Sequence, residues 1–167
     1  ELEARALLAL GRAAETEATV RDGMEGGLAD LNRAYLLYLL EGADRYEAAL
    51  ELADEILAAV VESAPAPART LATVALTGNR PKRALRAALG EQREPLVALI
   101  RGRVRALLGL DRATEAADIL DGVLATAARA DLPAATPILR AFAARERWAE
   151  LGDLATHALR RQHDDPF

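Results

Sequence analysis

The sequence contains no cysteine, which excludes disulfide bonds and zinc sites built on thiolates. It has only seven valines and four isoleucines, whereas a sheet protein normally needs more β-branched residues. Aromatic residues make up only 4% of the chain, and Lys82 is its single lysine. The longest uncharged run, residues 70–79, is far shorter than the roughly 18 residues that span a bilayer. These absences argue against a β-fold, a disulfide-stapled domain and a membrane-spanning segment.

The sequence is rich in alanine and leucine, which dominate an apolar fraction of 51%. Both residues are strong helix formers, and small alanines let neighbouring helices approach closely. This composition predicts an all-α protein with a packed core. The net charge of −5 argues against a general nucleic-acid binder or a membrane-surface binder, because both of those surfaces are anionic. No signal peptide is visible, so a cytoplasmic location is expected.

Glycine, proline and asparagine divide the chain into short helical stretches with no long linker between them. We therefore expect a single domain over residues 1–167. Because the chain begins at Glu1 and not at methionine, we interpret it as a fragment of a longer protein. The predicted helices span residues 2–10, 12–23, 28–41, 44–62, 66–77, 81–90, 95–109, 112–130, 134–145 and 147–162.

A short pattern recurs after four of the predicted turns: a bulky or apolar residue, then a small or apolar residue three positions later. The four copies begin at Tyr46, Pro81, Ala113 and Trp148. They end at Ala49, Ala84, Ala116 and Leu151, with steps of 35, 32 and 35 residues. A weaker copy precedes them, in which Gly11 and Ala18 correspond to Gly42 and Ala49. Each helix also carries an apolar stripe that a single hairpin cannot bury, so stacked hairpins are expected.

A helix–turn–helix period of about 34 residues resembles the tetratricopeptide repeat. Residues 42–57 look much like the turn and second helix of that family. The resemblance implies about five αα-hairpins stacked into a right-handed superhelix. It also implies that Tyr46 and Trp148 pack in the core, and that Ala49, Ala84 and Ala116 lie at close helix crossings. The first helices lack the family's Trp and Leu-Gly pair, so related solenoids such as pentatricopeptide, armadillo or HEAT repeats stay open.

Residues that could support catalysis are few. Ser63, the only serine, lies in a proline-rich turn without a nearby histidine. Asp153 and His157 are four residues apart, which is typical of a solvated pair near a helix C-terminus more often than of a metal site. The glycine-rich residues 23–27 follow no strand and precede no Lys-Ser or Lys-Thr pair, which argues against a phosphate loop. No enzyme activity, cofactor or metal is expected.

Arginines on the predicted first helices are the most informative polar residues. In the tetratricopeptide family the first helix of each hairpin lines the concave groove, which implies groove-facing side chains at Arg69, Arg101, Arg105 and Arg140. Arg101 and Arg105 share one helix face, and like charges at that spacing are unfavourable without a ligand. Guanidinium groups suit carboxylates and phosphates. We expect these arginines to form one partner-binding surface, with Tyr38 near its edge.

The resemblance favours a protein-interaction scaffold that takes a peptide or protein segment, acidic in character, in a concave groove. The alternative is the helical sensor or oligomerisation domain of a larger bacterial transcriptional activator, in which case self-association is expected as well. An RNA-reading repeat is disfavoured by the acidic net charge and by the lack of a regular polar code across the repeats. An enzyme is disfavoured because no catalytic constellation is present.

Overall fold

The computed structural model describes residues 2–25, 30–78, 93–126, 136–153 and 156. These residues form helices and turns and include no strand, which confirms the all-α prediction. The helices are α1 (Leu2–Ala9), α2 (Ala13–Glu25), α3 (Asp30–Gly42), α4 (Tyr46–Ser63), α5 (Ala66–Thr77), α6 (Arg93–Gly109), α7 (Ala113–Thr126) and α8 (Thr136–Ala143). Residues 148–153 are helical as well. Over this part of the chain, no helix combines the length and apolarity that crossing a bilayer requires.

Most helix ends lie within two or three residues of the predicted positions, because glycine and proline set them. Helix α5 begins after Pro65 and ends at Gly78, whose positive φ of 67° suits a residue without a Cβ. Helix α6 ends at Gly109, as predicted. The predicted helix at residues 81–90 lies outside the described residues, and so does Ala84.

A left-handed residue recurs in the turn that precedes each second helix of the predicted hairpins. Positive φ angles occur at Gly11, Asp44, Gly78, Asp111 and Glu146, at steps of 33, 34, 33 and 35 residues. In four of these turns the following residue is an arginine whose N–H bonds to the carbonyl five residues earlier, as in a Schellman motif. The period found in the sequence is therefore a period of helix-ending turns.

The turns correct the register of the first copy. Gly11 corresponds to Asp44, an offset of 33 residues, so Thr16 stands where Ala49 does. The amides of Thr16 and Ala49 donate to the carbonyls of Arg12 and Arg45 in the same way. Thr16 is fully buried, whereas Ala18 is exposed. The hydroxyl of Thr16 donates to the Arg12 carbonyl at 3.0 Å, so this polar residue enters the core with its hydrogen bond made.

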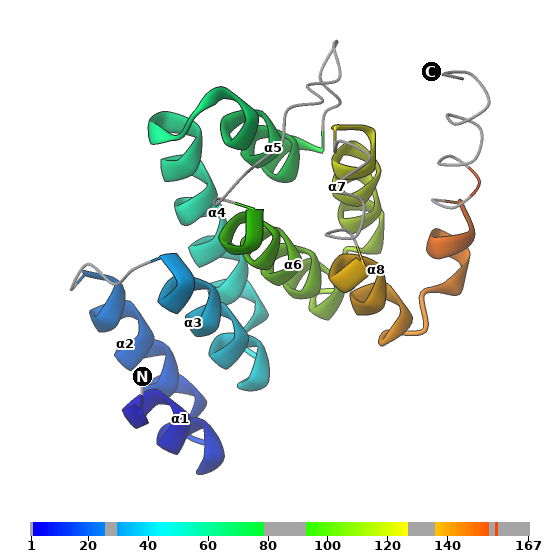
Figure 1. Cartoon of the computed structure of the whole chain (residues 1–167). Helices are drawn as coiled ribbons and strands as arrows, with labels where there is room; N and C mark the ends of the chain where they lie inside the picture. The colour runs from blue at the N-terminus through cyan, green and yellow to red at the C-terminus, as the bar shows by residue number, and fades with distance from the viewer. Residues whose placement is uncertain (1, 26–29, 79–92, 127–135, 154–155, 157–167) are drawn as a thin grey trace.

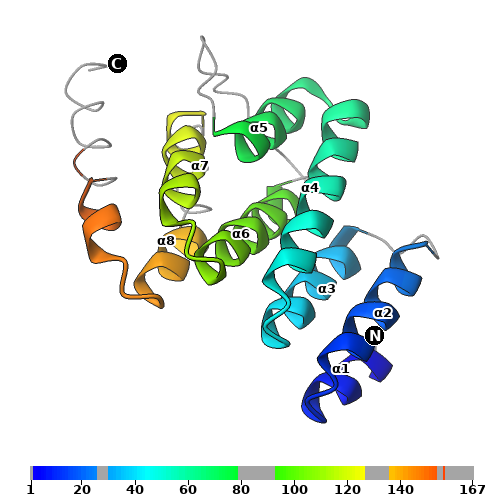
Figure 2. The ribbon, with the colours of Figure 1, turned by 180° about the vertical axis from the view of Figure 1, so that it is seen from behind.

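Helix α6 is the centre of the molecule. It packs against α3 and α4 on one side and against α7 and α8 on the other (Figures 1 and 2). A regular stack would instead place α5 between α3 and α6, because each hairpin would contact only its neighbours. In the structure α5 packs on α4 and α7 and lies beside the stack. The simple one-dimensional arrangement that the period predicts is therefore wrong at α5.

A buried arginine fastens α5 to this arrangement. Arg103 of α6 is only 7% exposed. Its Nε donates to Asp54 Oδ1 of α4 at 2.5 Å, and a terminal NH₂ donates to the Leu76 carbonyl of α5 at 3.3 Å. The carbonyls in the last turn of a helix have no partner in their own helix, so this contact satisfies one of them. One side chain thus ties three helices together.

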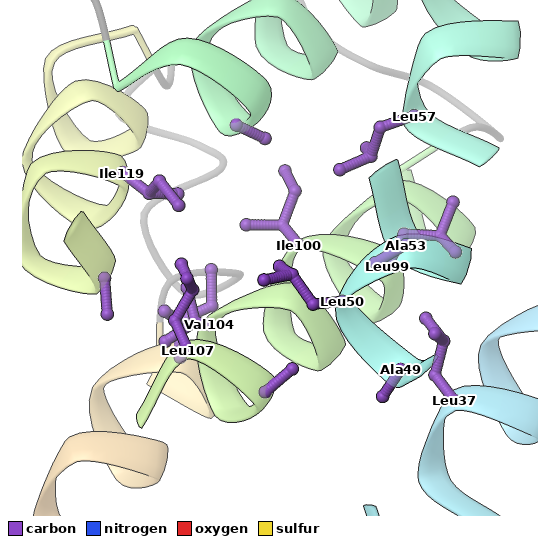
Figure 3. Close-up of a cluster of buried hydrophobic side chains, with 14 of the residues drawn as sticks. Leu37, Ala49, Leu50, Ala53, Leu57, Leu99, Ile100, Val104, Leu107 and Ile119 are labelled. Carbon is purple, nitrogen blue, oxygen red and sulfur yellow. The ribbon is translucent and has the colours of Figure 1, made fainter. Parts of the chain in front are cut away.

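The core is a continuous cluster that runs from Ala4 on α1 to Phe142 on α8. Figure 3 shows part of it, where Leu37, Ala53, Ile100 and Ile119 come from α3, α4, α6 and α7. Ala49 and Ala116 are fully buried, as predicted. Trp148 is not: the resemblance predicted a core position, but 63% of the residue is exposed, because none of the described helices packs over it. Tyr46 is half-buried.

The buried alanines give a direct test of the packing. Replacing Ala49 or Ala116 with leucine should lower the free energy of unfolding by about 1–3 kcal/mol, since added methyl groups have no space at a fully buried site. Ala58→Leu is the matched control, because Ala58 lies exposed on the same helix as Ala49. Chemical denaturation measures all three. Unchanged stability in both buried variants would show that these alanines do not mark tight crossings.

Candidate functional site

Four arginines gather around one open hollow. Arg101 and Arg105 come from one face of α6, Arg140 from α8, and Arg145 from the turn that follows α8. Together with Ala141 and Ala144 they enclose about 400 Å³. Four of the six residues that line the hollow are arginines, so it is a basic surface with some apolar lining.

Helix α3 contributes an aromatic and an acidic residue beside this hollow. Tyr38 is 52% exposed, while Tyr35 is half-buried and its ring stacks on Tyr38 at a centroid separation of 6.1 Å. The Arg105 guanidinium lies over the Tyr38 ring, 5.9 Å from its centroid. A cation at that distance is attracted by the face of the ring. Tyr38 therefore contacts Arg105 at the edge of the hollow. The sequence prediction had placed Tyr38 near the edge of the arginine surface.

The acidic residue is Glu41, which lies at the end of α3 and is only 6% exposed. Its Oε2 lies 2.8 Å from the Nε of Arg105. The two groups are close but not aligned as a hydrogen bond, so Oε2 has no hydrogen-bond donor in the described structure. Burial raises the pKa of Glu41 to about 7, while the positive charges of Arg105, Arg101 and Arg145 act to lower it. Desolvation outweighs three nearby cations at this carboxyl.

Arg145 contacts both the hydroxyl and the ring of Tyr46. Its NH₂ group donates to the Tyr46 hydroxyl at 2.9 Å, and the guanidinium carbon lies 5.2 Å from the ring centroid. The same hydroxyl donates to Asp44 Oδ1 at 2.8 Å. A Cβ on Gly109 would lie 2.4 Å from the Tyr46 ring, so only glycine lets the ring lie there. These contacts connect the turn after α8 to the start of α4.

The sequence prediction named three of the four arginines and grouped one wrongly. Arg69 does not line the hollow. Its guanidinium donates to the Ala64 carbonyl at 3.2 and 3.4 Å, just before its own helix α5. The displacement of α5 from the stack explains the error, since the prediction assumed that all first helices share one concave face. Glu41 and Arg145 were missed: no local pattern marks either of them, although Arg145 lies five residues after Arg140.

Ion pairs elsewhere show what distinguishes the hollow. Arg12 and Arg112 each pair with the glutamate three residues later, and Arg45 pairs with Glu17. Among the described residues, no carboxylate lies within ion-pair distance of Arg101 or Arg140. Within the described ranges, Arg101 and Arg140 thus differ from these paired arginines.

Over the described ranges, no three acidic or histidine side chains gather closely enough to hold a metal ion. Asp153 is exposed, while His157 lies outside the described residues. No family model matches the chain, and neither a curated protein nor a solved structure matches it.

Proposed function

We propose that this chain is an interaction module of the tetratricopeptide type, with about five hairpins in a right-handed superhelix, and that its hollow binds an acidic segment of a protein partner. The proposal rests on the gathering of Arg101, Arg105, Arg140 and Arg145 around one hollow, beside the buried carboxyl group of Glu41. The recurrence of the same turn at steps of 33–35 residues supports the repeat character. The shifted helix α5 makes it an irregular member of that type.

The chemistry of the hollow suits carboxylates. A guanidinium group presents a planar fork of donors that matches a carboxylate. Each charge-assisted hydrogen bond contributes about 1.5–3 kcal/mol when it is sheltered from water, and much less where the site is wet. Arg101 is half-buried and Arg140 is exposed, so the stronger contacts are expected toward α6. A peptide with several acidic residues would engage more than one arginine at once.

The overall charge helps to separate specific from non-specific binding. The chain carries a net charge of −5, so it repels a polyanion unless a local basic site attracts it. We expect a fluorescent hexaglutamate peptide to bind, with an affinity that falls steeply as salt is raised from 20 to 300 mM. A hexalysine peptide is the control for general charge attraction. Fluorescence anisotropy measures both. Absence of hexaglutamate binding at low salt, or binding that does not weaken as salt is raised, would contradict the proposal.

A further inference from the structure

Glu41 lies beside the hollow, and the binding of an acidic segment does not explain its placement there. It is buried between α3 and α6, where the Cβ that Gly102 lacks would lie 3.6 Å from Glu41 Oε1 and 2.9 Å from Leu37 Cδ1. The missing Cβ of Gly102 therefore lets Leu37 of α3 pack closely on α6, whereas a Cβ would make only ordinary contact with Glu41. Glu41 lies one turn after Leu37 on α3, so this close packing brings its carboxyl group near Arg105.

We propose that Glu41 is an internal competitor for Arg105, and that an acidic ligand displaces it by driving a proton from solvent onto its carboxyl group. This inference rests on the proposed function of the hollow. In the free protein the Nε of Arg105 lies 2.8 Å from Glu41 Oε2, and its guanidinium lies over the Tyr38 ring. Arg105 also lines the hollow. The Glu41 carboxylate thus pairs with a guanidinium group that a ligand would otherwise bind.

The positive charges that act on Glu41 come from α6 and from the turn after α8. Arg101 and Arg105 come from α6 and Arg145 from the turn after α8. The start of α4 carries Asp44, Arg45 and Tyr46, but these groups have partners of their own: Tyr46 and Asp44 bond to each other, and Arg45 pairs with Glu17 of α2. The cations of the hollow are therefore the groups that hold Glu41 in its charged form.

A bound anion changes that balance in one direction. When a ligand carboxylate takes Arg105 and Arg101, Glu41 loses the positive charges that oppose its desolvation, and it gains a negative charge nearby. Its carboxylate then takes up one proton from solvent and becomes a neutral carboxyl group, and no other bond changes. With a pKa of about 7 in the free protein, Glu41 is partly charged at neutral pH. Because the bound state holds more protons than the free state, binding must strengthen as pH falls and weaken as pH rises.

The probe is an acetylated and amidated hexaglutamate peptide, whose carboxylates stay ionised between pH 6 and pH 8.5. Isothermal titration calorimetry in two buffers with different ionisation enthalpies counts the protons taken up on binding. We expect a fraction of one proton at pH 7, and an affinity about tenfold weaker at pH 8.5 than at pH 6. In Glu41→Gln we expect no pH dependence from this group, and binding at pH 8.5 as tight as that of the unmodified chain at pH 6.

The outcomes separate the two proposals. Binding with the same pH dependence in the unmodified chain and in Glu41→Gln would overturn the internal competitor and leave the acidic-ligand site standing. Absence of hexaglutamate binding to either protein at any pH would overturn both. The buffer comparison uses the unmodified chain alone, so it decides the matter even if the glutamine variant does not fold: binding without proton uptake near pH 7 contradicts the inference.

Discussion

Replacing Phe142 with alanine is expected to lower the free energy of unfolding by about 3–5 kcal/mol, which is the usual cost of emptying a buried aromatic site. Phe142 is fully buried on α8, where Ile138 is fully buried as well. Helix α8 has only eight residues and packs on α6, so it has few other side chains to hold it there. The Phe142 carbonyl also accepts hydrogen bonds from the amides of Arg145 and Arg147. The buried ring therefore fixes the position of a carbonyl that closes the turn after α8.

The same variant should also weaken the hollow. Arg140 and Arg145 reach the site only if α8 and its turn stay docked on α6. Chemical denaturation measures the stability of the variant, and fluorescence anisotropy with the hexaglutamate peptide measures its binding. Phe142→Leu is the control, because it keeps apolar bulk at the site and should lose less in both. If Phe142→Ala left stability, amide exchange of α8 and peptide affinity unchanged, then α8 would not depend on this ring.

Much of the local structure was predictable from the sequence. Helices end where glycine or proline stands, and α5 is the clearest case, since Pro65 and Gly78 bound the predicted range of residues 66–77. The resemblance to the tetratricopeptide repeat predicted that Ala49 and Ala116 are buried, and both are. These features are local because they depend on backbone preferences and on periodicity within one hairpin.

The packing of elements far apart in the chain was not predictable in the same way. That α6 contacts α3 depends on where α5 lies, and Arg103 helps to fix α5 through Asp54 and Leu76. An isolated sequence does not mark Arg103 as different from its neighbours Arg101 and Arg105, although one is buried and the other two reach a hollow. The repeat period alone predicts that the first helices of all hairpins line one concave face.

The site shows the same division. Arg101 and Arg105 share a face because of helical spacing, which the sequence displays. Glu41 meets Arg105 only because α3 and α6 are neighbours, and Gly102 lets Leu37 of α3 pack closely on α6. For Trp148 the local pattern predicted burial and the tertiary structure does not provide it. Trp148 stands at the repeat position of Tyr46, but within the described part of the chain no helix covers it as α6 covers Tyr46. Local pattern identifies candidates, whereas tertiary neighbours decide what each one does.

If the arginine hollow attracts an acidic segment, the double variant Arg101→Glu, Arg140→Glu should lose most of that attraction. Arg105 is left intact, because a glutamate there would put a second carboxylate beside Glu41 and disturb folding. Loss of two charge-assisted contacts of about 1.5 kcal/mol each lowers affinity about hundredfold. The matched control is Arg5→Glu, Arg69→Glu, which makes the same change in net charge at two exposed arginines that do not line the hollow.

The deciding measurement is the affinity of hexaglutamate for these two variants and the unmodified chain, at equal ionic strength and with helicity checked by circular dichroism. We expect a fall of about hundredfold for Arg101→Glu, Arg140→Glu and a fall of less than about threefold for the control pair, because surface charges beyond a Debye length are screened. Equal losses in the two variants would show that only the net charge matters, and unchanged affinity in both would show that the hollow binds no acidic peptide.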